Sequence, residues 1–105
     1  MKVIITGGCG GMGRFLVRAV ARLKNIESIT IADLVESAAT EFASNFDHRV
    51  SGIGLDVSES GAMAEIFKHH DIVLNTIGPF FRFGKSVLEA ALRADCHYMD
   101  ICDDC

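Results

Sequence analysis

Apolar residues follow two alternating patterns along the chain. Short runs rich in β-branched residues, typical of buried strands, alternate with longer segments in which apolar residues fall three or four apart, as on one face of a helix. The predicted strands are 2–6, 28–32, 50–57, 71–76 and 97–101, and the predicted helices are 11–23, 37–46, 58–70 and 83–94. This alternation predicts an α/β fold with a parallel sheet and helices on both faces, and right-handed crossovers favour the strand order 3-2-1-4-5.

The helical spacing also indicates which residues face inward. In the first helix these are Met12, Leu16, Ala19, Val20 and Leu23. In the second they are Ala39, Phe42, Ala43 and Phe46, in the third Ala62, Ile66 and Phe67, and in the fourth Val87, Leu88, Ala91 and Leu92. The outer face of the first helix carries Arg14, Arg18 and Arg22, which we expect to be solvated, although Arg14 could reach a phosphate. Ser58 is the expected N-cap of the third helix, and His69 and His70 at its end are expected at the surface.

The turn between the first strand and the first helix is rich in glycine. It reads G-x-G-x-x-G over Gly8, Cys9, Gly10, Gly11, Met12 and Gly13. After a strand and before a helix, this motif predicts a doubly wound, Rossmann-type sheet that binds a dinucleotide. Gly8 allows a tight turn, Gly10 lets a diphosphate approach the main chain, and Gly13 lets the helix pack close to the strand. The alternative is a glycine-rich turn without a ligand, and the overlapping short-chain dehydrogenase motif from Thr6 fits equally well.

Acidic residues follow the second and third strands. Asp33 stands where a carboxylate accepts hydrogen bonds from the adenosine ribose, beside Leu34. No lysine or arginine follows in residues 34–36, so NAD is favoured as the cofactor and NADP is less favoured. Asp56 could accept from the adenine amino group, and Val57 could pack on the ring. The alternatives are that Asp33 caps the next helix and that Asp56 is a loop residue.

The loop after the fourth strand is expected to lie across from the glycine turn. The backbone of Thr76, Ile77 and Gly78 is predicted to face the nicotinamide ribose. Phe80 and Phe81 either line a pocket there or take part in ordinary packing.

The segments G-P-F-F-R-F-G (78–84), V-L-E-A-A (87–91) and C-H-Y-M-D-I-C-D-D (96–104) resemble the saccharopine dehydrogenase family. The resemblance implies that this is an N-terminal NAD(P)-binding domain and that a second domain supplies most of an amino-acid pocket. It implies an oxidoreductase that transfers hydride at the carbon–nitrogen bond of an amino-acid substrate. It also implies that Phe80 and Asp100 lie where the cofactor and substrate regions meet. Catalytic residues remain unassigned.

The composition limits the kinds of partner that we expect this chain to bind. The 105 residues are half apolar with a net charge of −4, so we expect one domain that binds no nucleic acid, because no basic face is present. No apolar run approaches the ~18 residues that cross a bilayer, so we expect a cytoplasmic protein without membrane contact. The chain stops after its fifth strand, so we expect it to be part of a longer two-domain enzyme, inactive alone. An open edge strand makes a homodimer possible.

Four cysteines are expected to be reduced, and no metal is expected, because the C-x-x-C pair at Cys102 and Cys105 has no second pair of ligands. Two further functions compete with the enzyme. One is a regulatory NAD(H)-sensing module without catalysis, and the other is a methyl-donor-binding domain. The aromatic loop after the fourth strand favours the enzyme, since a pure sensor needs no aromatic wall beside the nicotinamide.

Overall fold

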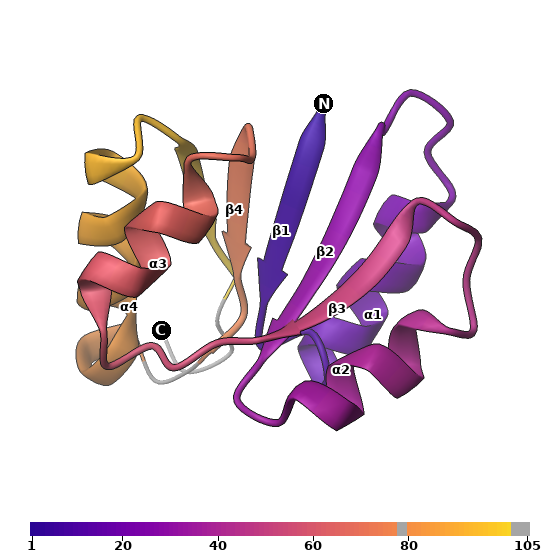
Figure 1. The fold of residues 1–105 in the computed structure, drawn as a ribbon, viewed down its shortest axis with the longest axis horizontal. Coiled ribbons are helices and arrows are strands. Elements are labelled where there is room, and N and C mark those ends of the chain that lie inside the picture. Colours follow the sequence, from indigo (N-terminus) through magenta and orange to yellow (C-terminus); the bar gives the residue numbers. More distant parts are fainter. Residues whose placement is uncertain (78–79, 102–105) are drawn as a thin grey trace.

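A computed structural model of the chain describes residues 1–77 and 80–101. Of residues 80–84 it describes only the backbone. Strands and helices alternate from β1 to β5 (Figure 1). The strands are β1 (Lys2–Thr6), β2 (Ser28–Asp33), β3 (Val50–Gly54), β4 (Ile72–Asn75) and β5 (His97–Asp100). The helices are α1 (Gly11–Ala21), α2 (Glu36–Ala43), α3 (Ser60–Phe67) and α4 (Phe80–Arg93). The sheet is parallel throughout in the order β3-β2-β1-β4-β5, which confirms the predicted Rossmann-type topology.

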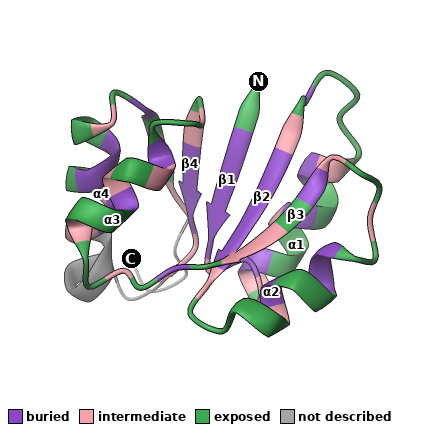
Figure 2. Cartoon of the chain, viewed as in Figure 1, coloured by how far each residue is buried: buried purple, intermediate pink, exposed green. Residues whose placement is uncertain are grey.

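The sheet separates two apolar cores. Helices α1 and α2 cover one face, and α3 and α4 lie on the other (Figure 1). Strand β1 lies at the centre and is buried on both faces, with Ile5 in the core under α1 and α2 and Ile4 in the core under α3 and α4 (Figure 2). Burial on both faces explains why this strand reads as a continuous apolar run instead of an alternating one.

The predicted inward face of α1 is rotated relative to the structure. Its buried residues are Gly13, Val17 and Val20, whereas Ala19 and Leu23 are exposed. Gly13 lies against the backbone of Gly7, and this close approach fixes which side of the helix meets the sheet. The pattern of α4 differs in the same way, because Val87, Ala90 and Ala91 are buried while Leu92 is 68% exposed.

The start of α3 also differs from the prediction. Its N-cap is Glu59 and not Ser58, because Ser58 is held by the carboxylate of Asp56. Met63 and Phe67 are buried, whereas Ala62 is exposed. His69 is exposed as expected, but His70 is half-buried and contacts Thr30.

Several element boundaries differ as well, and α2 and α3 each end three residues before the predicted end, at Ala43 and Phe67. Strand β3 ends at Gly54, three residues before the predicted end, and the backbone of Leu55 then bonds to the Asp33 carbonyl (2.8 Å). Helix α4 begins at residue 80 instead of 83.

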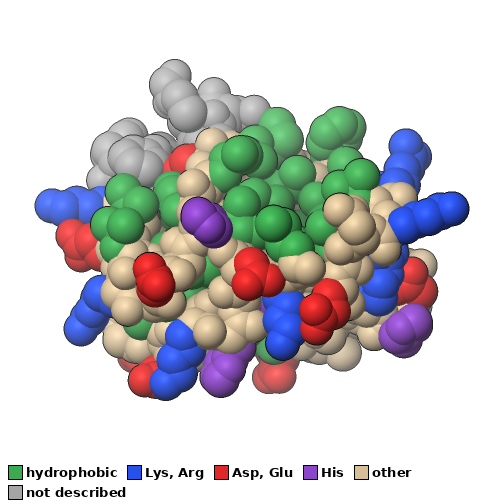
Figure 3. Space-filling model, turned by 90° about the horizontal axis from the view of Figure 1, so that it is seen from above, with side chains coloured by type: hydrophobic (Ala, Val, Ile, Leu, Met, Phe, Trp, Pro, Cys, Tyr) green, Lys and Arg blue, Asp and Glu red, His purple; other side chains and the backbone are tan. Residues whose placement is uncertain are grey.

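Apolar side chains form a patch on the side where β1 begins, with charged side chains around its lower and lateral rim (Figure 3). Large apolar residues that are exposed in the described part of the chain are Met1, Phe15, Leu23, Leu34, Val35, Leu92 and Met99. These side chains do not test the homodimer that the open edge strand makes possible, so self-association stays a prediction. None of the described helices is long and apolar enough to span a bilayer.

Candidate functional site

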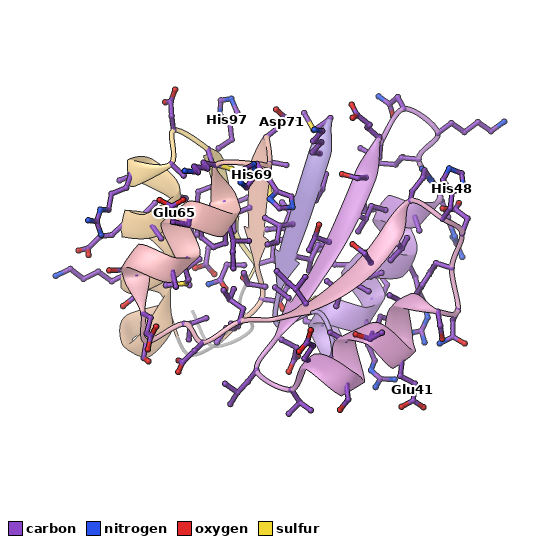
Figure 4. The ribbon with its side chains drawn as sticks, viewed as in Figure 1. Glu41, His48, Glu65, His69, Asp71 and His97 are labelled. Carbon is purple, nitrogen blue, oxygen red and sulfur yellow. The ribbon has the colours of Figure 1, made fainter. Side chains whose placement is uncertain are left out.

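The carboxyl ends of the strands meet along one edge of the sheet. The register aligns Thr6 with both Ala32 and Asn75, Asp33 with Gly54, and Asn75 with Asp100. The chain adds β2 and β3 on one side of β1 and then β4 and β5 on the other side. Doubly wound sheets bind ligands at this switch point, between β1 and β4. Figure 4 shows His69, Asp71 and His97 at the opposite edge, so these titratable side chains lie away from the candidate site.

Close packing accounts for three glycines of the turn. Gly7 has a φ of +80°, which favours glycine, and its N–H bonds to the Ala32 carbonyl (2.8 Å). A Cβ on Gly8 would lie 2.5 Å from Ile31 Cγ2, and a Cβ on Gly13 would overlap the Gly7 carbonyl oxygen. The positive φ of the turn thus lies at Gly7, while Gly13 lets α1 approach β1 as predicted.

Gly10 and Gly11 have no such internal reason to be glycine. A Cβ on Gly10 would make only an ordinary contact, 3.5 Å from the Gly7 carbonyl oxygen, and a Cβ on Gly11 would meet nothing within 4 Å. Both added Cβ atoms would have open space around them. The missing side chains leave the backbone bare toward that space, which fits a ligand that contacts the main chain.

The start of α1 offers hydrogen-bond donors to the same space. Gly10 is the N-cap and has no side chain that could cap the helix. The N–H groups of Gly11, Met12 and Gly13 belong to the first turn, which has no intrahelical acceptors, and no acceptor among the described residues bonds to them. Together with the helix dipole, these donors favour an anion such as a phosphate group.

Asp33 lies beside this turn. Its Oδ2 accepts the Cys9 N–H at 3.3 Å, and its Oδ1 accepts the Val35 N–H at 3.4 Å. The N-cap of α2 is Val35, so Asp33 does not cap that helix. Cys9 is partly buried, and its thiol pKa is raised by burial and by the negative charge of Asp33.

A pocket of about 350 Å³ opens between the ends of β1, β2 and β3 and the loop after β4. It is lined by Gly7, Asp33, Leu34, Leu55, Asp56, Val57, Ser58 and Ile77. The Asp56 Oδ1 accepts the Ser58 hydroxyl (2.7 Å) and the Ser58 N–H (2.9 Å), and these bonds lower the pKa of the Asp56 carboxyl. The pocket thus joins predicted site residues from three separate segments.

A buried polar network continues the edge toward β5. Thr6 Oγ1 donates to Asn75 Oδ1 (2.6 Å), which also accepts the Ile77 N–H (3.2 Å). Asn75 Nδ2 donates to the Tyr98 hydroxyl (3.3 Å) and to Asp100 Oδ2 (3.4 Å). The other oxygen, Asp100 Oδ1, is buried and has no hydrogen-bond partner among the described residues. A buried acceptor without a donor is costly, and in native proteins it is often functional.

Sequence reasoning missed the joining role of Thr6, Asn75 and Tyr98. The sequence signal for it is weak: Thr6 and Asn75 are the polar last residues of the apolar strands β1 and β4, whereas Tyr98 lies within β5. Thr76 adds a further tie, because its hydroxyl contacts the carbonyls of Thr6 (2.8 Å) and Gly7 (3.1 Å). Gly78 and the side chains of Phe80 and Phe81 lie outside the described residues, so their predicted contacts are not placed.

Comparison with known proteins identifies the family. Residues 3–103 match the family model described as the saccharopine dehydrogenase NADP binding domain. The chain belongs to this family.

Two relatives and two solved structures illustrate what the chain is similar to. The chain is 24% identical to a Caenorhabditis elegans lipid droplet localized protein, over 94% of this chain and 25% of the relative. It is 34% identical to Escherichia coli dTDP-glucose 4,6-dehydratase, over 67% of this chain and 20% of the relative. The structure of Saccharomyces cerevisiae saccharopine dehydrogenase (L-Glu forming) superposes with a TM-score of 0.79 at 22% identity, covering 95% of this chain and 21% of that one. A Veillonella parvula short-chain dehydrogenase/reductase gives 0.76 at 15% identity, covering 95% and 47%.

The family establishes a dinucleotide-binding domain of the oxidoreductase type. The chain spans only 20% to 25% of the length of the Caenorhabditis elegans and Escherichia coli relatives. The family description names NADP, so it does not support the preference for NAD that Asp33 predicts.

Proposed function

We propose that this saccharopine dehydrogenase-type domain binds NAD(H) and serves an oxidoreductase that transfers hydride at the carbon–nitrogen bond of an amino-acid substrate. The observation that carries the proposal is the pocket between Asp33 and Asp56, which adjoins a glycine turn with a bare backbone and unpaired N–H groups. Hydride exchange itself is chemistry that the nicotinamide supplies when bound.

The diphosphate and the adenosine of the cofactor each have candidate groups on the chain. The diphosphate would be held by the N–H groups of Gly11 and Met12 in front of Gly10, where the helix dipole favours negative charge. The adenosine would occupy the 350 Å³ pocket, with Asp33 accepting from its ribose. Asp56 and Val57 line the same pocket and are the groups available to the adenine.

The preference for NAD(H) rests on charge. Asp33 places a carboxylate where NADP carries an additional phosphate on the ribose, and like charges repel. The next residues, Leu34, Val35 and Glu36, provide no positive charge to offset it. We therefore expect NADH to bind more tightly than NADPH.

The substrate side of the proposal depends on β5. Asp100 ends this strand next to Asn75, on the far side of β1 from the adenosine pocket. A buried carboxylate oxygen without a described donor suits a ligand that brings an N–H group, and it favours the enzyme over a purely regulatory module. The rest of the amino-acid pocket would come from another part of the whole protein.

The test is titration of NADH and NADPH into the protein, followed by fluorescence or calorimetry. The Gly10→Val variant should lose binding of both, because its side chain fills the space in front of the turn. Gly61→Val is the matched control, since Gly61 also has open space around its Cβ position but lies on α3. Unchanged affinity in a folded Gly10→Val variant would refute the glycine-turn site. Equal or inverted affinities of the unmodified protein for NADH and NADPH would refute the NAD preference.

A further inference from the structure

The outer face of α1 and its C-cap carry Arg14, Arg18 and Arg22, which lie four residues apart and are all exposed, as predicted. In the described part of the chain, none of the three has a carboxylate within 4.0 Å, although the sequence has 14 aspartates and glutamates. The helix dipole favours positive charge in the last turn, but Arg14 lies close to the start of α1, where the dipole favours negative charge. The dipole therefore does not account for the whole row.

Aromatic side chains from α2 and the turn after it lie against this row. Helices α1 and α2 are side by side on one face of the sheet (Figure 1). The guanidinium carbons of Arg14 and Arg18 lie 4.9 Å and 5.6 Å from the centre of the Phe42 ring. Phe42 in turn meets the Phe46 ring edge to face, with 5.2 Å between the ring centres. Stacking on Phe42 restricts the two guanidinium groups, so they lose less side-chain freedom when they bind a ligand.

A hollow of about 570 Å³ lies between the arginine row and these rings. We call it the basic groove, and its lining includes Arg14, Arg18, Arg22, Phe42, Asn45 and Phe46. None of its described lining residues carries a carboxylate, and none of them lines the pocket that contains Asp33. The basic groove is thus a positively charged, partly aromatic surface outside the proposed dinucleotide pocket.

The two ends of the basic groove differ in their charge and contacts. At one end, Arg14 Nε donates to the Cys9 carbonyl oxygen (2.9 Å), and Glu41 lines an adjoining hollow together with Arg14. At the other end, Arg18 and Arg22 form no hydrogen bond or ion pair with any described residue. The unused positive charge of the groove therefore lies at the end formed by Arg18 and Arg22.

We propose that the basic groove binds an acidic segment of a protein partner in an extended conformation. Arg18 and Arg22 lie about 6 Å apart along the helix axis, and alternate residues of an extended segment lie about 6.6 Å apart on one face. Carboxylates at alternate positions can thus each meet one guanidinium, which binds carboxylates through paired N–H donors. The net charge of −4 disfavours a nucleic acid or an anionic membrane, whose charges extend beyond the groove, whereas a short acidic segment contacts the groove alone. This inference does not depend on the proposed dinucleotide site.

The test uses a fluorescein-labelled octapeptide of alternating glutamate and alanine, with fluorescence anisotropy as the readout of binding to the protein. A peptide with glutamine in place of each glutamate should bind about tenfold more weakly. Arg18→Gln and Arg22→Gln should each weaken binding of the glutamate peptide about threefold, and the double variant about tenfold, as expected for exposed ion pairs. Arg93→Gln is the matched control, because it removes an exposed arginine from α4 on the opposite face of the sheet and should change binding less than about 1.5-fold. Thermal unfolding checks that each variant is folded.

Four outcomes would overturn the inference. The first is a folded protein that does not bind the glutamate peptide, or that binds the glutamine peptide equally well. The second is an effect of Arg93→Gln as large as that of Arg18→Gln, which would show general charge attraction instead of a groove. The third is tighter binding of an oligothymidylate or of phosphatidylserine vesicles, which would assign the groove to a nucleic acid or a membrane. The fourth is displacement of the peptide by NADH, which would place the groove within the dinucleotide site.

Discussion

The Tyr98 hydroxyl donates to Asp100 Oδ2 at 2.7 Å, while Asp100 Oδ1 is buried without a donor among the described residues. One oxygen of the carboxylate is therefore held by Tyr98 and Asn75, and the other lacks the bond that burial requires.

This arrangement predicts that neutralising the Asp100 carboxylate stabilises the fold. Asp100→Asn removes the negative charge from a half-buried carboxylate that has no described cationic partner, so we expect it to raise the free energy of unfolding by about 1 kcal/mol in urea denaturation. Asp71→Asn is the matched control, because Asp71 is an exposed carboxylate at the other end of β4, and its amide can still accept the Lys2 N–H. A loss of stability in Asp100→Asn larger than in the control would contradict the expectation.

Tyr98→Phe should act in the opposite direction. It removes the shortest described donor to the Asp100 carboxylate, so we expect a loss of about 1–2 kcal/mol in the free energy of unfolding. In the Asp100→Asn background the same change should cost less, because the bond then reaches a neutral acceptor. Equal costs in both backgrounds, measured in a double-mutant cycle, would show that the two side chains are not coupled.

Substitution by alanine should have different effects on the free energy of unfolding at two glycines of the turn. Gly13→Ala forces a Cβ onto the Gly7 carbonyl, so we expect a loss of about 3 kcal/mol in the free energy of unfolding. Gly11→Ala meets nothing within 4 Å and begins a helix, so it should be neutral or stabilising by about 0.5 kcal/mol. Urea denaturation of the pair checks this, and similar effects of both changes would mean that α1 does not approach β1 as described.

His70 should make stability depend on pH. Burial lowers the pKa of its imidazole, and the neutral ring bridges the Thr30 hydroxyl (2.8 Å) and the Ile66 carbonyl (3.0 Å). A lowered pKa means that the unfolded chain binds the proton more readily. The stabilisation is thus fully present above the ordinary pKa of about 6.5 and is lost as the pH falls toward the lower pKa of the folded state.

The measurement is the free energy of unfolding between pH 8 and pH 5 for the unmodified protein and His70→Gln. The variant should lose part of the acid-side slope. His48→Gln is the control, because His48 is exposed on the loop before β3 and should keep the whole slope (Figure 4). A His70→Gln curve parallel to that of the unmodified protein would rule out His70 as the source.

Arg49 should be a major contributor to stability although it belongs to no predicted site. Its guanidinium donates to the carbonyls of Ala21 (2.7 Å), Leu23 (2.8 Å) and Ile26 (3.2 Å), and it pairs with Asp47 (3.0 Å). We expect Arg49→Ala to cost about 2–3 kcal/mol and Arg49→Lys to recover little, because an ammonium group cannot reproduce the fork of donors. Full recovery by lysine in urea denaturation would contradict this geometry.

The sequence predicted the order of elements because each strand and helix carries its own periodic pattern. The positions of the glycine turn, Asp33 and Asp56 at one edge of the sheet were predictable for a related reason, since each lies at or shortly after the carboxyl end of a strand. The inward face of α1 was not, because the contact of Gly13 with Gly7 selects the buried stripe, and the apolar pattern fits two neighbouring stripes.

Contacts between distant parts of the chain were also beyond the sequence. Thr6 and Asn75 are 69 residues apart, and Arg49 bonds to carbonyls 23 to 28 residues earlier. Neither pairing leaves a periodic signal, because each depends on the strand register and on where α1 ends. Ser58 shows the same limit locally, since the choice between capping α3 and bonding Asp56 is decided by the turn after β3.

The pairing of Asp33 with Gly54 makes the distance between Asp33 and Asp56 depend on the register of β2 and β3. Sliding β3 by one residue along β2 would carry Asp56 about 3.3 Å away and turn Ile53 toward the wrong core. In the proposed site, a change that misaligns these two strands would therefore move Asp56 relative to Asp33 and alter the pocket that both residues line.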